Sequence, residues 1–288
     1  ASKRGSFAGI GKKPPIWNDR VIRSHHIGGE GPKGHMFPYR DENETQRAAI
    51  VTGTIIGLNV LSWLLLQGAG TTLPLARSVC ELGLIPGELT ASVAPGTRFP
   101  MGNGLVCVTD PGRQVSHLFT SMFLHGSWMH LLGNMWFLWI FGNNVEDSMG
   151  RLRFVVFYLV CGLAAAFGQV LASPASAIPM VGASGAISGV MGGYLVLYPN
   201  VRVFAMVPLG FFLTSVALPA WVMLGYWFLI QFVSGLVDIG GEQGGVAFWA
   251  HIGGFLAGLI LIKLFARPDY VAEHRSHHWR PRRLMREW

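Results

Sequence analysis

Six long apolar runs constrain this chain more than any other feature of its sequence. They cover residues 48–66, 117–142, 152–172, 184–199, 217–237 and 247–266. A helix needs about 20 predominantly apolar residues to cross the hydrocarbon core of a bilayer, and all the runs except 184–199 reach or approach that length. Only 13% of the residues are charged, whereas soluble domains carry about 25%. We therefore predict an all-α membrane protein with a six-helix membrane domain at residues 48–266, a polar basic tail of low order at residues 1–47 and a second basic tail at residues 267–288.

The basic residues predict how these helices are oriented. Nineteen of the 22 Lys and Arg residues lie in the two tails, at the inner end of the last run, or in the connections after the second and fourth runs. The other three are Arg77, Arg98 and Arg113. Because Lys and Arg concentrate in cytosolic loops, both termini are expected in the cytosol. We expect the tails to face anionic membrane lipids rather than nucleic acid.

The N-terminal residues bear on the cellular location. The first 45 residues lack the apolar core of a cleavable signal peptide. They also show no additional span and no clear transit segment rich in Arg and Ser. The expected location is therefore the plasma (inner) membrane of a bacterium.

The connection at residues 67–116 is unusually long and is expected outside the cell. Its segment 75–89, "LARSVCELGLIPGEL", has helical periodicity and one apolar face, which predicts a helix lying at the membrane surface. Cys80 and Cys107 share this connection, and disulfides persist in oxidising compartments. The sequence leaves open whether the two cysteines form a bridge or remain separate thiols.

The fourth run is shorter than the hydrocarbon core of a bilayer. Sixteen helical residues rise roughly 24 Å, whereas the hydrocarbon core is about 30 Å thick. The preceding loop at residues 173–184 must then enter the membrane. Non-helical backbone is tolerated at that depth only inside protein or beside a water-filled cavity. The short run therefore predicts a cavity with Ser184 at its floor.

A few polar side chains interrupt the apolar runs, and these are functional candidates because polar groups are costly in lipid. They are His125, His130, Asn134, Ser184 and His251. His130 and Asn134 are four residues apart and share one helix face. A serine beside a neutral histidine is the nucleophile and base pair of acyl transfer, and His130 and Asn134 could donate hydrogen bonds to an oxyanion. No acidic third member is present, so the prediction is a two-residue dyad.

Stripes of small residues predict how Ser184 and His251 meet. Gly185, Gly189 and Gly193 follow Ser184 at four-residue spacing, and Gly254 and Gly258 follow His251. Such stripes let helix backbones approach closely in lipid, which would bring the hydroxyl and the imidazole together.

Other functions fit the polar residues less well. A serine among glycines commonly serves helix packing alone, and a lone membrane histidine can be a packing residue. His125 and His130 are five residues apart and poorly phased for one metal ion, so we expect no metal or cofactor. A transporter would need charged residues along its path, and a haem protein would need paired axial ligands.

Three motifs together resemble the rhomboid family of intramembrane serine proteases. They are "HGSWMHLLGN" (125–134), "GASG" (182–185) and "AHIGGFLAG" (250–258), in the family's order. The resemblance implies a six-helix bundle with a short central fourth helix and a long first external loop. It also implies that Ser184 is the nucleophile, that His251 is the base and that transmembrane proteins are the substrates. His130 and Asn134 match the family's oxyanion-side residues, and His125 its accompanying histidine.

The resemblance assigns further segments and leaves two departures. Glu146, near the end of the second helix, would have a structural role, and the glycine-rich loop 237–246 would be a mobile cap. Ser188 stands where some members carry a tyrosine that stacks on the base histidine, and Ser116-His117 replaces a common Trp-Arg pair. Residues 202–219 are expected to be an interfacial connection. The alternative function is a non-catalytic scaffold or accessory subunit that binds a membrane complex through its tails.

Overall fold

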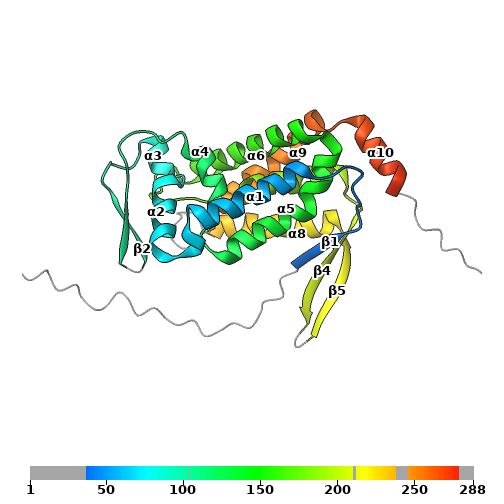
Figure 1. The fold of residues 1–288 in the computed structure, drawn as a ribbon, viewed down its shortest axis with the longest axis horizontal. Coiled ribbons are helices and arrows are strands. Elements are labelled where there is room, and N and C mark those ends of the chain that lie inside the picture. Colours follow the sequence, from blue (N-terminus) through cyan, green and yellow to red (C-terminus); the bar gives the residue numbers. More distant parts are fainter. Residues whose placement is uncertain (1–36, 103, 210–211, 238–245, 279–288) are drawn as a thin grey trace, which may run out of the picture.

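A bundle of apolar helices forms the centre of the molecule (Figure 1). The structure, a computed structural model, describes residues 37–102, 104–209, 212–237 and 246–278. The α-helices are α1 (Ile50–Leu65), α2 (Thr72–Leu82), α3 (Pro86–Thr90), α4 (His117–Thr120), α5 (Trp128–Met149), α6 (Arg151–Ala172), α7 (Ser184–Leu197), α8 (Ala220–Val237), α9 (Phe248–Phe265) and α10 (Pro268–His278). Two 3-10 turns, η1 (Gly68–Gly70) and η2 (Ser121–Phe123), precede α2 and α5.

In the described part of the chain, five strands lie outside the helical bundle. They are β1 (Phe37–Asp41), β2 (Arg98–Gly102), β3 (Leu105–Val108), β4 (Arg202–Leu209) and β5 (Phe212–Pro219). β2 and β3 form an antiparallel hairpin, and β1, β4 and β5 form an antiparallel sheet in the order β1-β4-β5. The described chain is mostly helical, as expected, but the all-α class is too narrow because the expected connection 202–219 is a β-hairpin.

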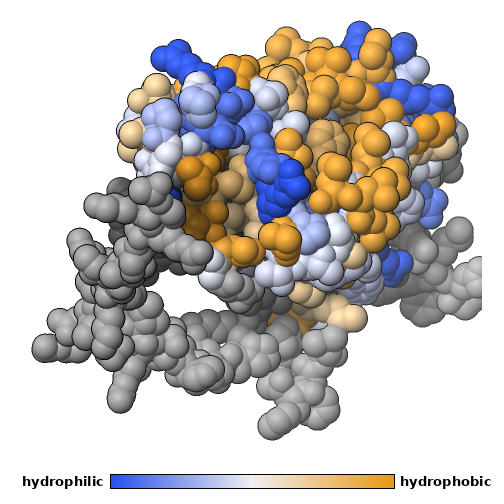
Figure 2. Space-filling view, turned by 60° about the vertical axis from the view of Figure 1, so that its left-hand side comes forward, coloured by the Kyte–Doolittle hydropathy of each residue, from blue (hydrophilic) through white to orange (hydrophobic). Residues whose placement is uncertain are grey.

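Among the described residues, three helices are long and apolar enough to cross a membrane by length and composition: α6, α8 and α9. The helices α1 and α7 are apolar but shorter. Large hydrophobic areas cover the face seen in Figure 2. Exposed apolar side chains on the bundle include Leu65, Trp139, Leu171, Ile260 and Leu264. Such a surface has no apolar partner within the described chain, as expected of helices that face lipid.

The second apolar run differs most from its expected boundaries. The sequence predicts a span over residues 117–142, but the structure breaks this run into α4, η2 and α5. Ser127 ends the break, because its side-chain oxygen accepts a hydrogen bond from the backbone N–H of His130 and caps α5. The helix α5 then continues to Met149, seven residues beyond the expected end. His125 consequently lies before the helix instead of within it.

The short helix α7 lies at the centre of the bundle. Every residue from Gly185 to Tyr194 is buried, and α7 contacts α5, α6, α8 and α9. Its most extensive contact is with α9. A helix that is apolar on all sides is typical of such a central position, so the low polarity of α7 and its burial agree.

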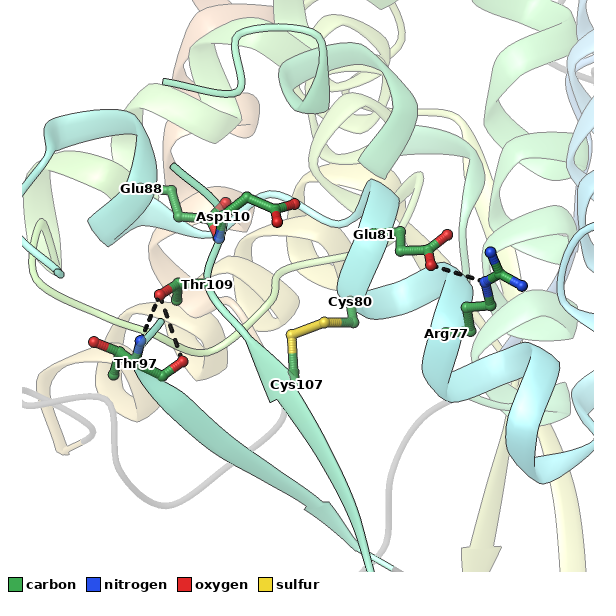
Figure 3. Close-up of a disulfide and its surroundings, with 8 residues drawn as sticks. All are labelled: Arg77, Cys80, Glu81, Glu88, Thr97, Cys107, Thr109 and Asp110. Carbon is green, nitrogen blue, oxygen red and sulfur yellow. Dashed lines mark hydrogen bonds and ion pairs between the residues drawn. A yellow bond between two sulfur atoms is a disulfide. The ribbon is translucent and has the colours of Figure 1, made fainter. Parts of the chain in front are cut away.

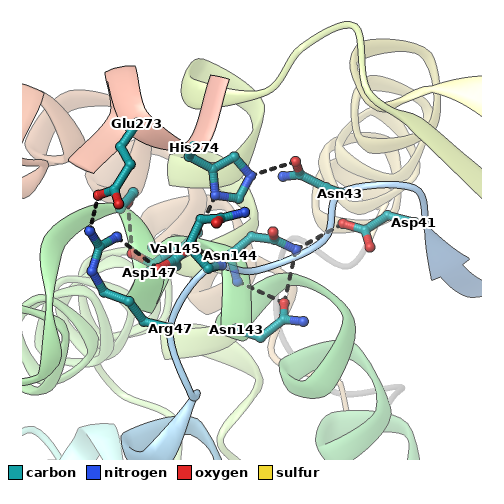
Figure 4. A network of polar contacts seen from close by, with 11 residues as sticks. Asp41, Asn43, Arg47, Asn143, Asn144, Val145, Asp147, Glu273 and His274 are labelled. Atoms are coloured by element: carbon teal, nitrogen blue, oxygen red, sulfur yellow. Dashed lines mark hydrogen bonds and ion pairs between the residues drawn. The ribbon is translucent and has the colours of Figure 1, made fainter. Parts of the chain in front are cut away.

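A network of polar contacts ties both flanking segments to one end of the bundle (Figure 4). Asp147 of α5 accepts hydrogen bonds from Arg47 and from the backbone N–H of Gln46, and it contacts Nδ1 of His274 at 2.9 Å. Arg47 also pairs with Glu273 of α10. Arg47 and His274, which lie in the segments expected to be tails, therefore contact the bundle directly. Residues 1–36 and 279–288 of those tails lie outside the described residues.

Glu146 fixes the start of α1. Its two carboxylate oxygens accept the backbone N–H groups of Val51 at 2.9 Å and Thr52 at 2.7 Å, and the Thr52 hydroxyl at 2.8 Å. The first N–H groups of a helix have no partner within the helix, and a carboxylate is favoured there by the helix dipole. These contacts give Glu146 a structural role, as the family resemblance implied.

A disulfide connects the parts of the long segment at residues 67–116. Cys80 of α2 and Cys107 of β3 are bonded, with their Cα atoms 5.5 Å apart (Figure 3). The surrounding contacts are polar: the backbone N–H of Thr97 donates to the Thr109 hydroxyl, and the Glu88 carboxylate accepts the backbone N–H of Asp110. The structure thus takes the bridged alternative. The segment 75–89 is helical in α2 and α3 but is interrupted at residues 83–85, so the single helix predicted there is divided in two.

Candidate active site

Ser184 and His251 meet at the start of two neighbouring helices. Ser184 is the first residue of α7, and His251 lies in the first turn of α9. The Oγ atom of Ser184 is 2.8 Å from Nε2 of His251. A hydroxyl at this distance from an unprotonated imidazole nitrogen can be activated as a nucleophile. The predicted pair is therefore assembled in the structure.

Glycines bring these two helices together. A Cβ atom built on Gly254 would overlap the backbone carbonyl of Gly185, and one built on Gly258 would overlap that of Gly189. The two stripes predicted from the sequence are therefore in direct contact. Backbones this close leave no room for side chains between them. The first turns of α7 and α9 are therefore near enough for Ser184 and His251 to form a hydrogen bond.

His130 faces the same space from α5. The backbone N–H of Gly126 donates to its Nδ1 at 3.2 Å. Because Nδ1 accepts this bond, the neutral imidazole carries its hydrogen on Nε2. Gly182 has a φ of +130°, and a Cβ there would lie 2.8 Å from Nε2 of His130. A glycine thus allows the loop before Ser184 to pass directly beside the His130 ring.

A cavity of about 800 Å³ contains all four polar groups. Its lining includes His130, Asn134, Ser184 and His251. Asn134 is buried, and its side-chain Nδ2 atom has no hydrogen-bond partner among the described residues. A buried donor without a partner costs free energy, so its presence in the lining of the same cavity as Ser184 favours a role in binding an oxygen atom.

His125 lies behind this group. It is fully buried, its ring centroid is 5.1 Å from that of His130, and it is outside the cavity lining. Its main chain is held by Gln67, which accepts from the His125 N–H at 2.8 Å and donates to the His125 carbonyl at 2.7 Å. The structure therefore places His125 as packing support for His130. It does not bring His125 to the cavity.

A neighbour of His251 was not anticipated from the sequence. Nδ1 of His251 lies 2.8 Å from Oε1 of Gln231 on α8. Trp227, one turn earlier on α8, has its ring centroid 5.9 Å from that of His251. Gln231 is the one amide within the expected span 217–237. That isolated amide is the sequence signal that could have found it.

Ser188 has a local role in the helix. Its hydroxyl donates to the backbone carbonyl of Ser184 at 2.7 Å. Such bonds to the carbonyl four residues earlier satisfy a buried hydroxyl within its own helix. Ser188 thus occupies the position where some family members carry a tyrosine, but it does not stack on His251. The aromatic ring beside that histidine belongs to Trp227.

The chemistry of this cavity is set by neutral groups. None of its described lining residues is Asp, Glu, Lys or Arg. Nor do the described ranges hold any group of three or more His, Cys, Asp or Glu side chains that could bind a metal ion. The glycine-rich loop 237–246 was expected to cover the site, and residues 238–245 of it lie outside the described residues.

Several named proteins are similar in sequence to the part of the chain that contains this site. The chain is 29% identical over 170 residues to rhomboid protease GluP of Bacillus subtilis, covering 56% of this chain and 32% of that protein. It is 30% identical over 152 residues to rhomboid-like protein 11, chloroplastic, of Arabidopsis thaliana, covering 51% of each chain. Rhomboid protein 1, mitochondrial, of Saccharomyces cerevisiae is 29% identical over 144 residues, covering 49% of this chain and 39% of that protein.

These relatives differ in their printed names and in their cellular compartments, and the chain spans between a third and a half of their lengths. The family model described as the Rhomboid domain matches residues 112–268. That match covers more than half of the chain and includes α5 to α9, Ser184 and His251. The chain therefore belongs to the rhomboid family, whose members are integral membrane proteins.

Proposed function

We propose that this protein is an intramembrane serine endopeptidase that cleaves peptide bonds in or near transmembrane segments of other proteins. The observation that carries the proposal is the 2.8 Å contact between Ser184 Oγ and His251 Nε2 at a cavity whose lining also includes His130 and Asn134. Family membership supports this chemistry, since several relatives are named rhomboid proteases.

The proposed reaction is acyl transfer. His251 accepts the hydroxyl proton through Nε2 while Ser184 Oγ attacks the substrate carbonyl carbon. The oxyanion then accepts hydrogen bonds from Asn134 Nδ2, from His130 Nε2–H and from the Ser184 backbone N–H at the start of α7. The protonated His251 donates its proton to the leaving amine, and water hydrolyses the acyl-enzyme by the reverse sequence of proton transfers.

We also propose the membrane arrangement that this chemistry needs. The helices α1, α5, α6, α7, α8 and α9 form six spans, and both termini lie on the cytosolic side of a bacterial plasma membrane. The basic residues in the flanking segments support that orientation. The membrane domain at 48–266 would then open its cavity towards the outer surface, because Ser184 lies at the outer end of the short α7. Transmembrane proteins and membrane lipids are the expected partners.

Cleavage of a model transmembrane substrate in detergent or liposomes tests the proposal. The wild-type chain should release two fragments, and Ser184→Ala and His251→Ala should each abolish cleavage. Ser188→Ala is the matched control, because it removes a hydroxyl from the same helix and leaves the dyad in place. Full cleavage by Ser184→Ala would refute the proposal. An inactive wild-type chain that co-purifies with a stable membrane partner would favour the scaffold alternative.

A further inference from the structure

The side chain of His251 is held on both of its ring nitrogens. Nε2 faces Ser184 of α7, and Nδ1 faces Gln231 of α8. Each distance is 2.8 Å. The imidazole therefore connects three helices, and the helix α8 contributes a contact that the two-residue dyad alone does not contain.

The chemistry of Gln231 determines where the hydrogen of His251 lies. An amide oxygen can only accept a hydrogen bond, so the nitrogen that faces it must be the protonated one. Neutral imidazole carries one hydrogen. When Nδ1 carries it, Nε2 has a free lone pair and can accept the proton of Ser184. The contact with Oε1 thus favours the one tautomer in which His251 can act as a base.

We propose that Gln231 is a positioning residue that holds His251 in this tautomer and orientation. The inference rests on the proposed function of Ser184 and His251 and deepens it. Gln231 takes the place that an acidic residue occupies in soluble serine hydrolases. A neutral amide supplies the same acceptor and avoids burying a carboxylate in a membrane helix, which would be costly.

Two other residues near His251, Ser188 and Trp227, cannot take this role. Ser188 bonds to its own helix backbone and does not reach the imidazole. The ring of Trp227 is tilted by 37° to that of His251 and offers it no acceptor atom. Rotation of the imidazole is thus limited by Trp227 on one side, but the choice between the two nitrogens depends on Gln231.

The test uses the full chain and measures kcat and KM for a transmembrane substrate. Gln231→Leu removes the acceptor and should lower kcat about tenfold, the effect of one orienting hydrogen bond, while KM stays within about twofold. Gln231→Glu keeps an acceptor oxygen at the same position and should keep kcat within about threefold of wild type. The matched control is Gln169→Leu in α6, because Oε1 of Gln169 has no hydrogen-bond partner among the described residues.

The outcomes separate positioning from packing and from the proposed function. If Gln231→Leu retains the kcat of the Gln169→Leu control, or if Gln231→Glu falls as far as Gln231→Leu, Gln231 does not position His251. Gln231→Met, which keeps the side-chain length, replaces the leucine variant should that protein not purify in a folded form. Ser184→Ala is measured in parallel: cleavage by that variant would overturn the proposed function itself, whereas its inactivity leaves the Gln231 comparison as the deciding result.

Discussion

Gly254 of α9 packs directly against the backbone carbonyl of Gly185, the residue that follows Ser184. This contact lies one turn from His251, and the distance between the two helices therefore determines the distance between the hydroxyl and the imidazole. Gly258 and Gly189 repeat the contact one turn further on. The geometry of the dyad thus depends on glycines that take no part in the chemistry.

Replacing Gly258 should separate these helices. A Cβ at this position overlaps backbone atoms of Gly189, which cannot move as a flexible side chain could. Overpacking of this kind costs about 1–3 kcal/mol, so Gly258→Ala should lower the thermal midpoint in detergent. Gly225→Ala in α8 is the control, because nothing lies within 4 Å of its added methyl group. Equal midpoints for the two variants would contradict the close contact.

Removing the donor of Asn134 should slow the reaction and leave the fold intact. Nδ2 of this residue has no partner among the described residues, so its loss breaks no observed hydrogen bond. Loss of one oxyanion donor costs about 10²–10³ in kcat. Asn134→Leu should therefore show this loss with an unchanged KM and thermal midpoint. A variant with wild-type kcat would exclude Asn134 from the oxyanion site.

The disulfide predicts a simple alkylation pattern. Denatured but unreduced protein should take up one alkyl group, on Cys161, because Cys80 and Cys107 are bonded. Reduction should raise the number to three, and mass spectrometry distinguishes the two cases. Cross-linking residues 27 positions apart stabilises a fold by about 3 kcal/mol in the chain-entropy account. Cys80→Ser should accordingly lower the thermal midpoint, and three alkyl groups without reductant would contradict the bridge.

Asp41 should make the stability of the flanking segments depend on pH. Burial raises the pKa of its carboxyl group to about 6, against an opposing effect of the hydrogen bond from the Tyr194 hydroxyl. The folded state then holds this proton more tightly than the unfolded state, whose carboxyl titrates near about 3.9. The contribution of Asp41 to the free energy of unfolding is therefore largest below about pH 3.9. It falls as the pH rises towards 6, by at most about 3 kcal/mol.

The variant Asp41→Asn isolates this effect. Its amide oxygen can still accept from Tyr194 and from Asn144, the two side chains that donate to Oδ2 in the structure. The thermal midpoint of the wild type should fall relative to the variant between pH 4.5 and pH 7. A difference between the two proteins that stays constant over this range would contradict the raised pKa.

The central residues could be predicted because lipid makes them conspicuous. Polar groups are rare in apolar spans, so Ser184, His251, His130 and Asn134 stood out, and the glycine stripes indicated which helices approach each other. Gln231 was missed although the amide of Asn134 was among the candidates, because no adjacent polar residue or known motif marks it in the sequence of α8. Its importance depends on the rotation of α8 about its axis, which the sequence of that helix does not determine.

The strands were missed for a different reason. Residues 202–219 are almost continuously apolar and contain Pro208 and Pro219, so they lack the alternation that predicts a half-buried strand. Their pairing with β1 depends on a segment more than 160 residues earlier in the chain. The contacts of Asp147 with Arg47 and His274 are equally remote in sequence, since each partner is about a hundred residues or more away.

Covalent labelling of Ser184 tests the central claim most directly. A fluorophosphonate probe reacts with a serine that an adjacent base activates, so the folded wild-type chain should carry one adduct, and peptide mapping should place it on Ser184. His251→Ala should abolish the adduct without unfolding the protein, while Ser188→Ala should retain it. An adduct on another serine, or no adduct on folded protein that also fails to cleave a transmembrane substrate, would contradict the assignment of Ser184 as the nucleophile.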